Sequence, residues 1–141
     1  MKHLFIINPE AGKGKSMTYE DIIKDYFQSS PDSYIIEKTK YPGHATELVK
    51  DYTSREDYRV YAIGGDGTLN EVLNGMVHTN SVLGVIPCGS GNDFVKSIVN
   101  DIDRDIFRRT VEGKEEFIDL GMVNGKYFLN ILFVKFCLNT S

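Results

Sequence analysis

The stretch from Ile63 to Glu71, Ile-Gly-Gly-Asp-Gly-Thr-Leu-Asn-Glu, constrains the fold of this chain more than any other part. A run of strand character, residues 58–63, leads into it, and apolar residues at helical spacing follow it. Glycine has no Cβ, so the backbone N–H groups of such a turn can approach a ligand closely. The stretch therefore predicts either a phosphate site at a helix N-terminus or a tight turn that Asp66 or Thr68 caps.

Strand and helix patterns alternate along the rest of the chain. The apolar run at residues 4–7 predicts a parallel strand buried on both faces, and further strands are predicted at residues 34–39, 58–63 and 82–86. Helical spacing follows each of them, at residues 17–28, 45–52, 68–78 and 94–99, with a further helix over 103–111. This alternation predicts an α/β fold, with a mainly parallel sheet and helices on both faces.

Glycine-rich turns follow the first, third and fourth of these strands. They cover residues 8–16, 63–71 and 87–93. Because ligands of open α/β sheets bind at the carboxyl ends of the strands, we expect the three turns to converge on one site.

Composition limits the function and the location. The net charge of −4 argues against nucleic-acid binding, which usually requires a basic surface. The two cysteines, Cys88 and Cys137, lie far apart and suggest neither a disulfide framework nor a metal site. No apolar run approaches membrane-spanning length. These features favour a protein of the reducing cytoplasm.

Two common nucleotide-binding motifs match poorly. A P-loop would need glycine five residues before Gly14, and Pro9 stands there. The dinucleotide-binding fingerprint would need a third glycine after Gly65 and Gly67, where Asn70 stands. Neither a P-loop NTPase nor a Rossmann-type enzyme is therefore expected.

Taken together, the loops resemble the catalytic domain of the diacylglycerol kinase family, which includes bacterial lipid kinases and the sphingosine and ceramide kinases. The matching pieces, in order, are Asn8-Pro9 with Gly12, Thr39, Gly43-His44-Ala45, Gly64 to Glu71, Pro87, Gly89 to Phe94, Ile118 to Gly121 and Tyr127 to Asn130. The Gly-Gly-Asp-Gly-Thr core is shared with NAD kinases, whereas its combination with Gly-Ser-Gly-Asn-Asp is more specific. Ser90 stands where threonine is usual and keeps the hydroxyl.

The resemblance implies a site for ATP with Mg²⁺. It assigns nucleotide binding to Asn8, Pro9, Glu10, Ala11, Gly12, Thr39, Gly65, Asp66, Gly67, Thr68, Leu69, Asn70, Glu71 and Ser90. Two roles stay open for Asp66, which either holds Mg²⁺ against the triphosphate or accepts the proton of the acceptor hydroxyl. Glu71 either orients Asp66 or the metal, or is a solvated helix residue.

Three further side chains have alternative readings. Lys13 and Lys15 either help to neutralise phosphates or are simply solvated. His44 is expected to form a hydrogen bond at a helix start rather than to act as a base.

By the same resemblance, the expected function is an ATP-dependent lipid kinase of phospholipid metabolism. It would transfer the γ-phosphate to a lipid hydroxyl such as that of diacylglycerol, with peripheral membrane contact. The alternatives are an NAD kinase-like enzyme with a soluble acceptor and a nucleotide-binding domain without catalysis. The Gly-Ser-Gly-Asn-Asp turn argues against the first.

The C-terminal part changes character. Residues 117–123 and 126–130 flank Asn124-Gly125, a pair suited to a type I′ hairpin. Members of the family continue into a β-rich second domain, so we expect an ATP-binding domain over residues 1–115 and the start of a missing second domain over 116–141. Two strands without their partner domain would expose an open edge. The chain is therefore expected to self-associate through residues 117–138, or to be disordered there, and to bind nucleotide without turnover.

Overall fold

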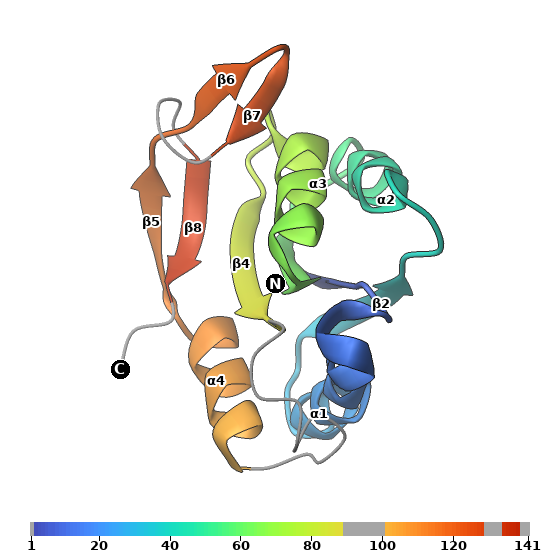
Figure 1. The fold of residues 1–141 in the computed structure, drawn as a ribbon. Helices are drawn as coiled ribbons and strands as arrows, with labels where there is room; N and C mark the ends of the chain where they lie inside the picture. The colour runs from blue at the N-terminus through green and yellow to red at the C-terminus, as the bar shows by residue number, and fades with distance from the viewer. Residues whose placement is uncertain (1, 89–100, 129–133, 139–141) are drawn as a thin grey trace.

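The computed structural model describes residues 2–88, 101–128 and 134–138, which form a six-stranded sheet flanked by helices (Figure 1). The sheet has the order β2-β1-β3-β4-β8-β5. Its strands are β1 (Lys2–Ile7), β2 (Ser33–Lys38), β3 (Arg59–Gly64), β4 (Val82–Pro87), β5 (Lys114–Ile118) and β8 (Val134–Leu138). The helices are the 3₁₀ segment η1 (Ala11–Met17) and the α-helices α1 (Thr18–Phe27), α2 (His44–Thr53), α3 (Asp66–Met76) and α4 (Asp101–Val111).

The first four strands pair in parallel, as the sequence predicts. Their register sets Ile7 beside Ile63, and Gly64 beside Pro87, so the carboxyl ends of β1, β3 and β4 lie level. The loops after these strands therefore leave the sheet at one edge. The predicted helix over 94–99 lies outside the described residues.

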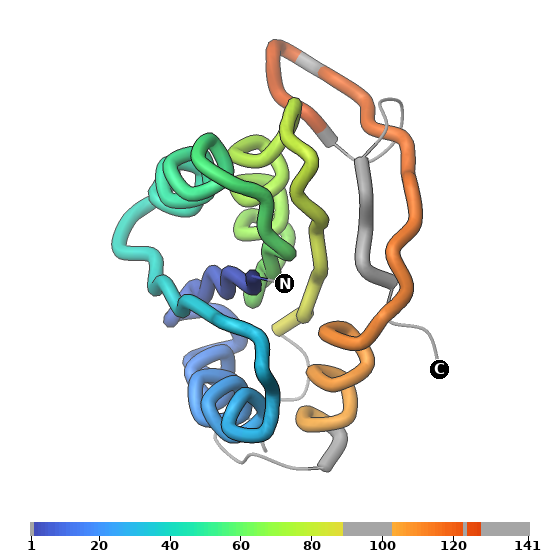
Figure 2. Tube along the Cα trace, turned by 180° about the vertical axis from the view of Figure 1, so that it is seen from behind, coloured from blue at the N-terminus to red at the C-terminus, as the bar shows by residue number. Residues whose placement is uncertain are grey.

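Alternating side chains of β1, β3 and β4 enter two separate cores. In β1, Leu4 and Ile6 pack with α2 and α3 on one face of the sheet. Phe5 and Ile7 pack with α1 and α4 on the other. Figure 1 and Figure 2 show the four helices from opposite sides. β1, β3 and β4 are buried on both faces, which explains why their sequences read as apolar runs, whereas the edge strand β2 is exposed or half-buried along its length.

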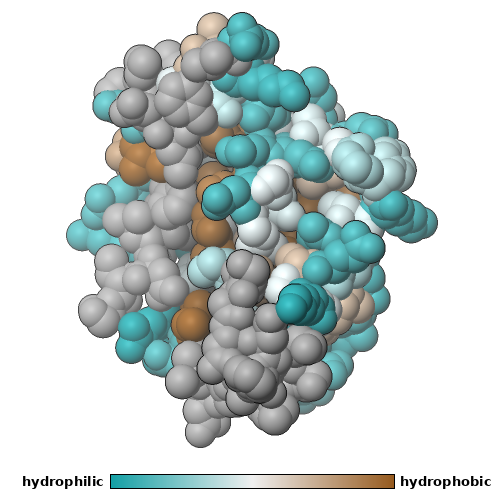
Figure 3. All heavy atoms as spheres, viewed as in Figure 1, coloured by the Kyte–Doolittle hydropathy of each residue, from teal (hydrophilic) through white to brown (hydrophobic). Residues whose placement is uncertain are grey.

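The outer surface over α2 and α3 is mostly hydrophilic (Figure 3). Apolar residues show in a narrow strip where β4 lies. Among the described residues, no helix has the length and apolar character needed to cross a membrane.

The hairpin is present but shorter than predicted. It consists of β6 (Gly121–Val123) and β7 (Lys126–Phe128), which form a separate two-stranded sheet. Asn124 and Gly125 have φ values of 51° and 79°, the left-handed backbone that a type I′ turn requires.

The expected strand over residues 117–123 is interrupted, and the later part of residues 117–138 pairs within the main sheet. The break follows Ile118, where β5 ends, and β6 begins only at Gly121. The later strand, β8, joins the main sheet between β4, to which it is parallel, and β5, to which it is antiparallel. Its insertion satisfies the backbone groups along the outer side of β4, which would otherwise form an open edge. Self-association stays a prediction.

Candidate functional site

A cavity of about 470 Å³ lies at the carboxyl edge of the sheet. Three segments form it: the loop after β1, the segment between β2 and α2, and the N-terminus of α3. Its lining residues are Asn8, Pro9, Glu10, Thr39, Lys40, Tyr41, Pro42, Ala45, Gly67, Thr68 and Glu71. Residues far apart in the sequence thus come together at the edge where the sequence predicts a site.

Asn8 shapes the loop after β1. Its backbone N–H donates to the carbonyl of Ile63 at 3.1 Å, which ties the loop to β3. Its side-chain Oδ1 accepts from the N–H of Glu10 at 3.1 Å. Its carbonyl accepts from the N–H of Ala11 at 3.1 Å and from the hydroxyl of the buried Ser16 at 2.5 Å. Asn8 therefore holds together both ends of the turn that brings Pro9 and Glu10 to the cavity.

The loop continues through three consecutive residues with left-handed backbone. Gly12, Lys13 and Gly14 have φ values of 61°, 55° and 94°. Gly12 packs against Cys88 after β4, and a Cβ at Gly12 would lie 3.4 Å from the Cys88 carbonyl oxygen. The loops after β1 and β4 are thus in direct contact, and burial raises the pKa of the Cys88 thiol to about 11.

Of the two roles expected for Lys15, simple solvation does not hold, because Lys15 forms an ion pair, and a role in neutralising phosphates stays a prediction. Its Nζ lies 3.3 Å from Oδ1 of Asp103, in the first turn of α4. Its side chain is only 23% exposed, so it is not a freely solvated cation. Sequence reasoning did not single out Asp103, because nothing in its local sequence marks a carboxylate that is buried by tertiary packing.

The glycines after β3 serve different purposes. A Cβ at Gly64 would lie 2.4 Å from Oγ1 of Thr68, so only glycine permits this close approach of the turn to α3. At Gly65 and Gly67 a Cβ would meet nothing within 4 Å. The space in front of these two residues is open, at the N-terminus of an eleven-residue helix. This arrangement suits an anion that approaches the backbone.

Asp66 is the first residue of α3 and is exposed. Within the described part of the chain, its carboxylate has no hydrogen-bond or ion-pair partner, and no group of three or more His, Cys, Asp or Glu side chains is arranged to hold a metal. Oxygen ligands from a carboxylate together with phosphate groups are what Mg²⁺ commonly binds. The exposed Asp66, beside the open space at Gly65 and Gly67, fits a metal shared with a bound triphosphate.

Glu71 joins the two helices that border the cavity. Its Oε1 accepts from the N–H of Ala45 at 3.2 Å, and its carbonyl accepts from the hydroxyl of Thr46 at 2.8 Å. The carboxylate therefore satisfies a backbone donor in the first turn of α2. Glu71 is half-buried and lines the cavity, so it is neither a simple solvated residue nor, in this structure, a partner of Asp66.

The wall formed by the start of α2 is fixed by His44 and Tyr41. Nδ1 of His44 accepts from the N–H of Lys40 at 3.0 Å, and its ring stacks on Tyr41 at 4.4 Å. The Tyr41 hydroxyl donates to Glu47 at 2.9 Å. His44 is thus the helix-start hydrogen-bonding residue that the sequence predicts.

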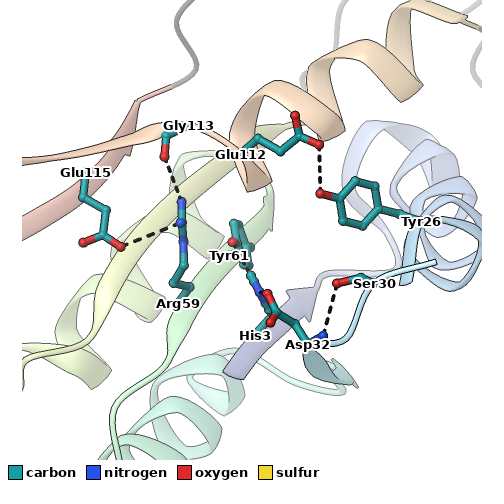
Figure 4. Close-up of polar contacts among 9 residues, drawn as sticks. All are labelled: His3, Tyr26, Ser30, Asp32, Arg59, Tyr61, Glu112, Gly113 and Glu115. Carbon is teal, nitrogen blue, oxygen red and sulfur yellow. Dashed lines mark hydrogen bonds and ion pairs between the residues drawn. The ribbon is translucent and has the colours of Figure 1, made fainter. Parts of the chain in front are cut away.

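A second polar network lies at the amino ends of the strands, away from the cavity (Figure 4). The ring of His3 is 3% exposed and lies 2.9 Å from the Tyr61 hydroxyl through Nδ1 and 3.0 Å from Asp32 through Nε2. Burial lowers the pKa of His3 below its ordinary value of 6.5, against the opposing effect of Asp32. A neutral ring satisfies both contacts if Tyr61 donates to Nδ1 and Nε2–H donates to Asp32. The sequence offered no partner for His3.

The structure thus gathers many of the predicted site residues. Of these, Asn8, Pro9, Glu10, Thr39, Gly67, Thr68 and Glu71 line the cavity. The others that are described, namely Ala11, Gly12, Gly65, Asp66, Leu69 and Asn70, lie on the same two segments beside it. Ser90 lies outside the described residues. The wall residues Lys40, Tyr41 and Pro42 were missed, although their position between Thr39 and the Gly43-His44-Ala45 motif could have indicated them.

Comparison with known proteins points to one family. The family model of the diacylglycerol kinase catalytic domain matches residues 2–123. A diacylglycerol kinase of Bacillus subtilis (strain 168) is 36% identical over 132 residues, a match that covers 89% of this chain and 43% of that protein. One of Staphylococcus aureus (strain MRSA252) is 37% identical over 140 residues, covering 89% of this chain and 41% of that protein.

Solved structures agree with this result. A structure described as a diacylglycerol kinase from Bacillus anthracis (strain Sterne) aligns with a TM-score of 0.61 at 29% identity, covering 90% of this chain and 47% of that one. A second structure from the same organism gives a TM-score of 0.68 at 30% identity, with 90% and 44% covered. The chain therefore spans less than half the length of these relatives.

Proposed function

This chain belongs to the diacylglycerol kinase catalytic domain family, and we propose that it forms the ATP-binding part of a kinase that transfers the γ-phosphate of ATP to a lipid hydroxyl. The observation that carries the proposal is the cavity at the carboxyl edge of the sheet, bordered by the N-terminus of α3. Its volume of about 470 Å³ is in the range of small-molecule sites.

The phosphates of ATP would lie at the N-terminus of α3. The open space in front of Gly65 and Gly67 lets phosphate oxygens reach the backbone, and the helix dipole favours their negative charge. Thr68, whose side chain lines the cavity, can donate its hydroxyl. The nucleoside would then extend toward the wall at Tyr41 and Pro42, which also line the cavity.

Asp66 would have one of two roles in the reaction: to hold the metal that neutralises the phosphate charge, or to accept the proton of the acceptor hydroxyl. When bound, Mg²⁺ would neutralise charge on the triphosphate, and Asp66 is the exposed carboxylate beside the phosphate space that fits it. Alternatively, the same carboxylate accepts the proton of the acceptor hydroxyl. Phosphoryl transfer needs mainly positioning and electrostatic stabilisation, which backbone donors and one carboxylate can supply.

We also propose the domain organisation expected from the sequence. A domain over residues 1–115 binds ATP, and residues 116–141 lead into a second domain. The acceptor site would lie in that second domain. Relatives more than twice as long as the matched segment support this division. On this proposal the 141-residue chain binds ATP but does not phosphorylate diacylglycerol by itself.

A chimaera tests the proposal. Residues 2–123 of this chain would replace the matched segment of the Bacillus subtilis relative, and γ-labelled ATP would be supplied with diacylglycerol vesicles, sphingosine or NAD. We expect labelled product from diacylglycerol and none from NAD, with the Asp66→Asn chimaera as the inactive control. A folded chimaera that phosphorylates NAD, or that binds no ATP, would overturn the proposal. Turnover by the 141-residue chain alone would overturn the proposal that the acceptor site lies in a second domain.

A further inference from the structure

The ion pair between Lys15 and Asp103 joins the loop after β1 to α4. Its two atoms lie 3.3 Å apart, and the Asp103 side chain is only 5% exposed. The hydroxyl of Tyr19 lies 3.5 Å from the same carboxylate oxygen, and Tyr19 is itself buried. A buried carboxylate is costly unless a cation and donors compensate it, so this pair depends on Lys15 staying in place.

Lys15 directly follows the left-handed segment of the site loop. Gly12, Lys13 and Gly14 depart from helical backbone, and glycine is the residue that loses most conformational freedom when it is ordered. Such a segment needs anchors. Asn8 supplies one through its bonds to Ser16 and Ile63, which tie the two ends of the loop to each other and to β3. The ion pair adds a second anchor, because it joins the loop to the first turn of α4.

The same ion pair determines whether the positive charge of Lys15 can reach a ligand in the cavity. With Asp103 paired to it, the ammonium of Lys15 is held toward α4, and Lys15 is absent from the residues that line the cavity. Glu10 and Pro9, which do line it, lie on the loop that the ion pair restrains. The pair can therefore affect the cavity through the conformation of the loop rather than through a phosphate contact.

We propose that Asp103 is a positioning residue of the nucleotide site, which acts through Lys15 to hold the loop of residues 9–14 against the cavity. The nature of the ligand rests on the proposed function. The competing account is that Lys15 is a phosphate ligand which Asp103 merely sequesters. The two accounts predict opposite effects when Asp103 loses its charge.

Asp103→Asn removes the charge and keeps the shape of the side chain. If the loop then adopts its cavity-lining conformation in only about one tenth of the molecules, the apparent Kd for ATP rises about tenfold. Lys15→Met should have a similar effect, and the double variant should be no worse than either single variant, because all three break the same ion pair. The double variant also leaves no buried charge unpaired, so it remains informative if a single variant fails to fold.

The experiment measures two quantities for each variant of the 141-residue chain. One is the Kd for MgATP by calorimetry, and the other is amide hydrogen exchange of residues 8–17 without nucleotide. The controls are Asp105→Asn, on the same helix but with a half-exposed side chain paired with Arg109, and Lys24→Met, an exposed lysine of α1 paired with Glu20. We expect weaker ATP binding and faster loop exchange in the Lys15 and Asp103 variants, and neither change in the controls.

Each other outcome has a definite meaning. Unchanged or tighter ATP binding in Asp103→Asn would overturn the positioning role, while ATP binding by the parent chain would still support the proposed function. If the parent binds no ATP, the proposed function fails and hydrogen exchange alone decides. Faster exchange at residues 8–17 only in the ion-pair variants then supports the inference, and unchanged exchange overturns it.

Discussion

Adjacent glycines in one turn can be required for unrelated reasons. Gly64 is enclosed, because Thr68 occupies the place a side chain would need. Gly65 has a φ of −95°, which any residue can adopt, and open space in front of it. The fold therefore requires glycine at Gly64 but not at Gly65, where only the proposed nucleotide site would require it.

This difference gives the first prediction. Gly65→Val should leave the fold intact and abolish ATP binding, because its side chain would occupy the phosphate path. Gly64→Ala should instead lower the free energy of unfolding by about 1–3 kcal/mol through overpacking against Thr68. Calorimetry with MgATP and urea unfolding followed by circular dichroism separate the two effects. ATP binding by Gly65→Val as tight as that of the parent would show that the site lies elsewhere.

The second prediction concerns Asp66. In the chimaera described above, Asp66→Asn should lower kcat for diacylglycerol by about 100-fold or more, with a smaller loss of ATP affinity, because its role belongs to the transition state. Steady-state kinetics and an ATP titration measure both quantities. Asp57→Asn, which changes an exposed aspartate before β3, is the control. An equal loss of affinity and rate would make Asp66 a simple binding residue.

At the scale of elements, α2 and α3 act as one support for the cavity. A Cβ at Gly75 would lie 2.8 Å from the carbonyl oxygen of Thr46 and from Cβ of Val49, so the two helices cross in very close contact. Glu71 adds a polar connection from α3 to the first turn of α2. These contacts therefore fix the distance between the start of α3, where the glycines lie, and the start of α2, which follows Tyr41.

The third prediction follows from that connection. Glu71→Ala leaves the N–H of Ala45 without its acceptor and should lower the free energy of unfolding by about 1–3 kcal/mol. Glu71→Gln keeps an acceptor oxygen and should cost less. Urea unfolding of both variants measures the difference, with the exposed Asp51→Ala in α2 as the control. Equal stabilities of Glu71→Ala and the parent would contradict the role of Glu71 in joining the helices.

The fourth prediction concerns pH and the strand β1. Because burial holds the pKa of His3 below 6.5, the unfolded chain binds a proton at a higher pH than the folded chain does. The stability that the neutral ring contributes is thus present above pH 6.5 and falls as the pH drops below that value. Asp32, whose pKa is lowered mainly by its hydrogen bond with His3, adds a loss only at lower pH, below 3.8.

Urea unfolding at several pH values tests this expectation. The parent should lose stability between pH 7 and pH 5, the interval in which an ordinary histidine titrates. His3→Gln should lose less stability over the same interval. An identical pH dependence in both proteins would mean that His3 does not titrate as its burial implies.

At the scale of the whole molecule, the sequence predicted what depends on local pattern. The strands β1, β3 and β4 were recognisable because their side chains, such as those of Leu4 to Ile7, are buried on both faces of the sheet. The hairpin turn was recognisable because Asn124-Gly125 suits left-handed backbone. The glycines around Asp66 indicated the edge at which the cavity lies. Each of these features is set by residues close together in the chain.

What the sequence did not predict depends on contacts between distant segments. β8 lies beside β4 because the outer edge of β4 would otherwise be unpaired. Nothing within residues 134–138 indicates that β4 is the partner. The bonds of Lys15 to Asp103 and of Glu71 to Ala45 likewise join separate elements. Local patterns therefore located the site, and tertiary contacts determined how its loops are held.

Nuclear magnetic resonance of the ¹⁵N-labelled chain during a MgATP titration tests the central claim most directly, because it shows where the nucleotide binds. We predict saturable shifts of the backbone amides of Thr39, Ala45, Gly65, Gly67 and Thr68. Amides in the groove between α1 and α4, such as Tyr26 and Arg108, should stay unchanged. Shifts confined to that groove, or none at ATP concentrations that saturate related kinases, would contradict the assignment of the cavity as an ATP site.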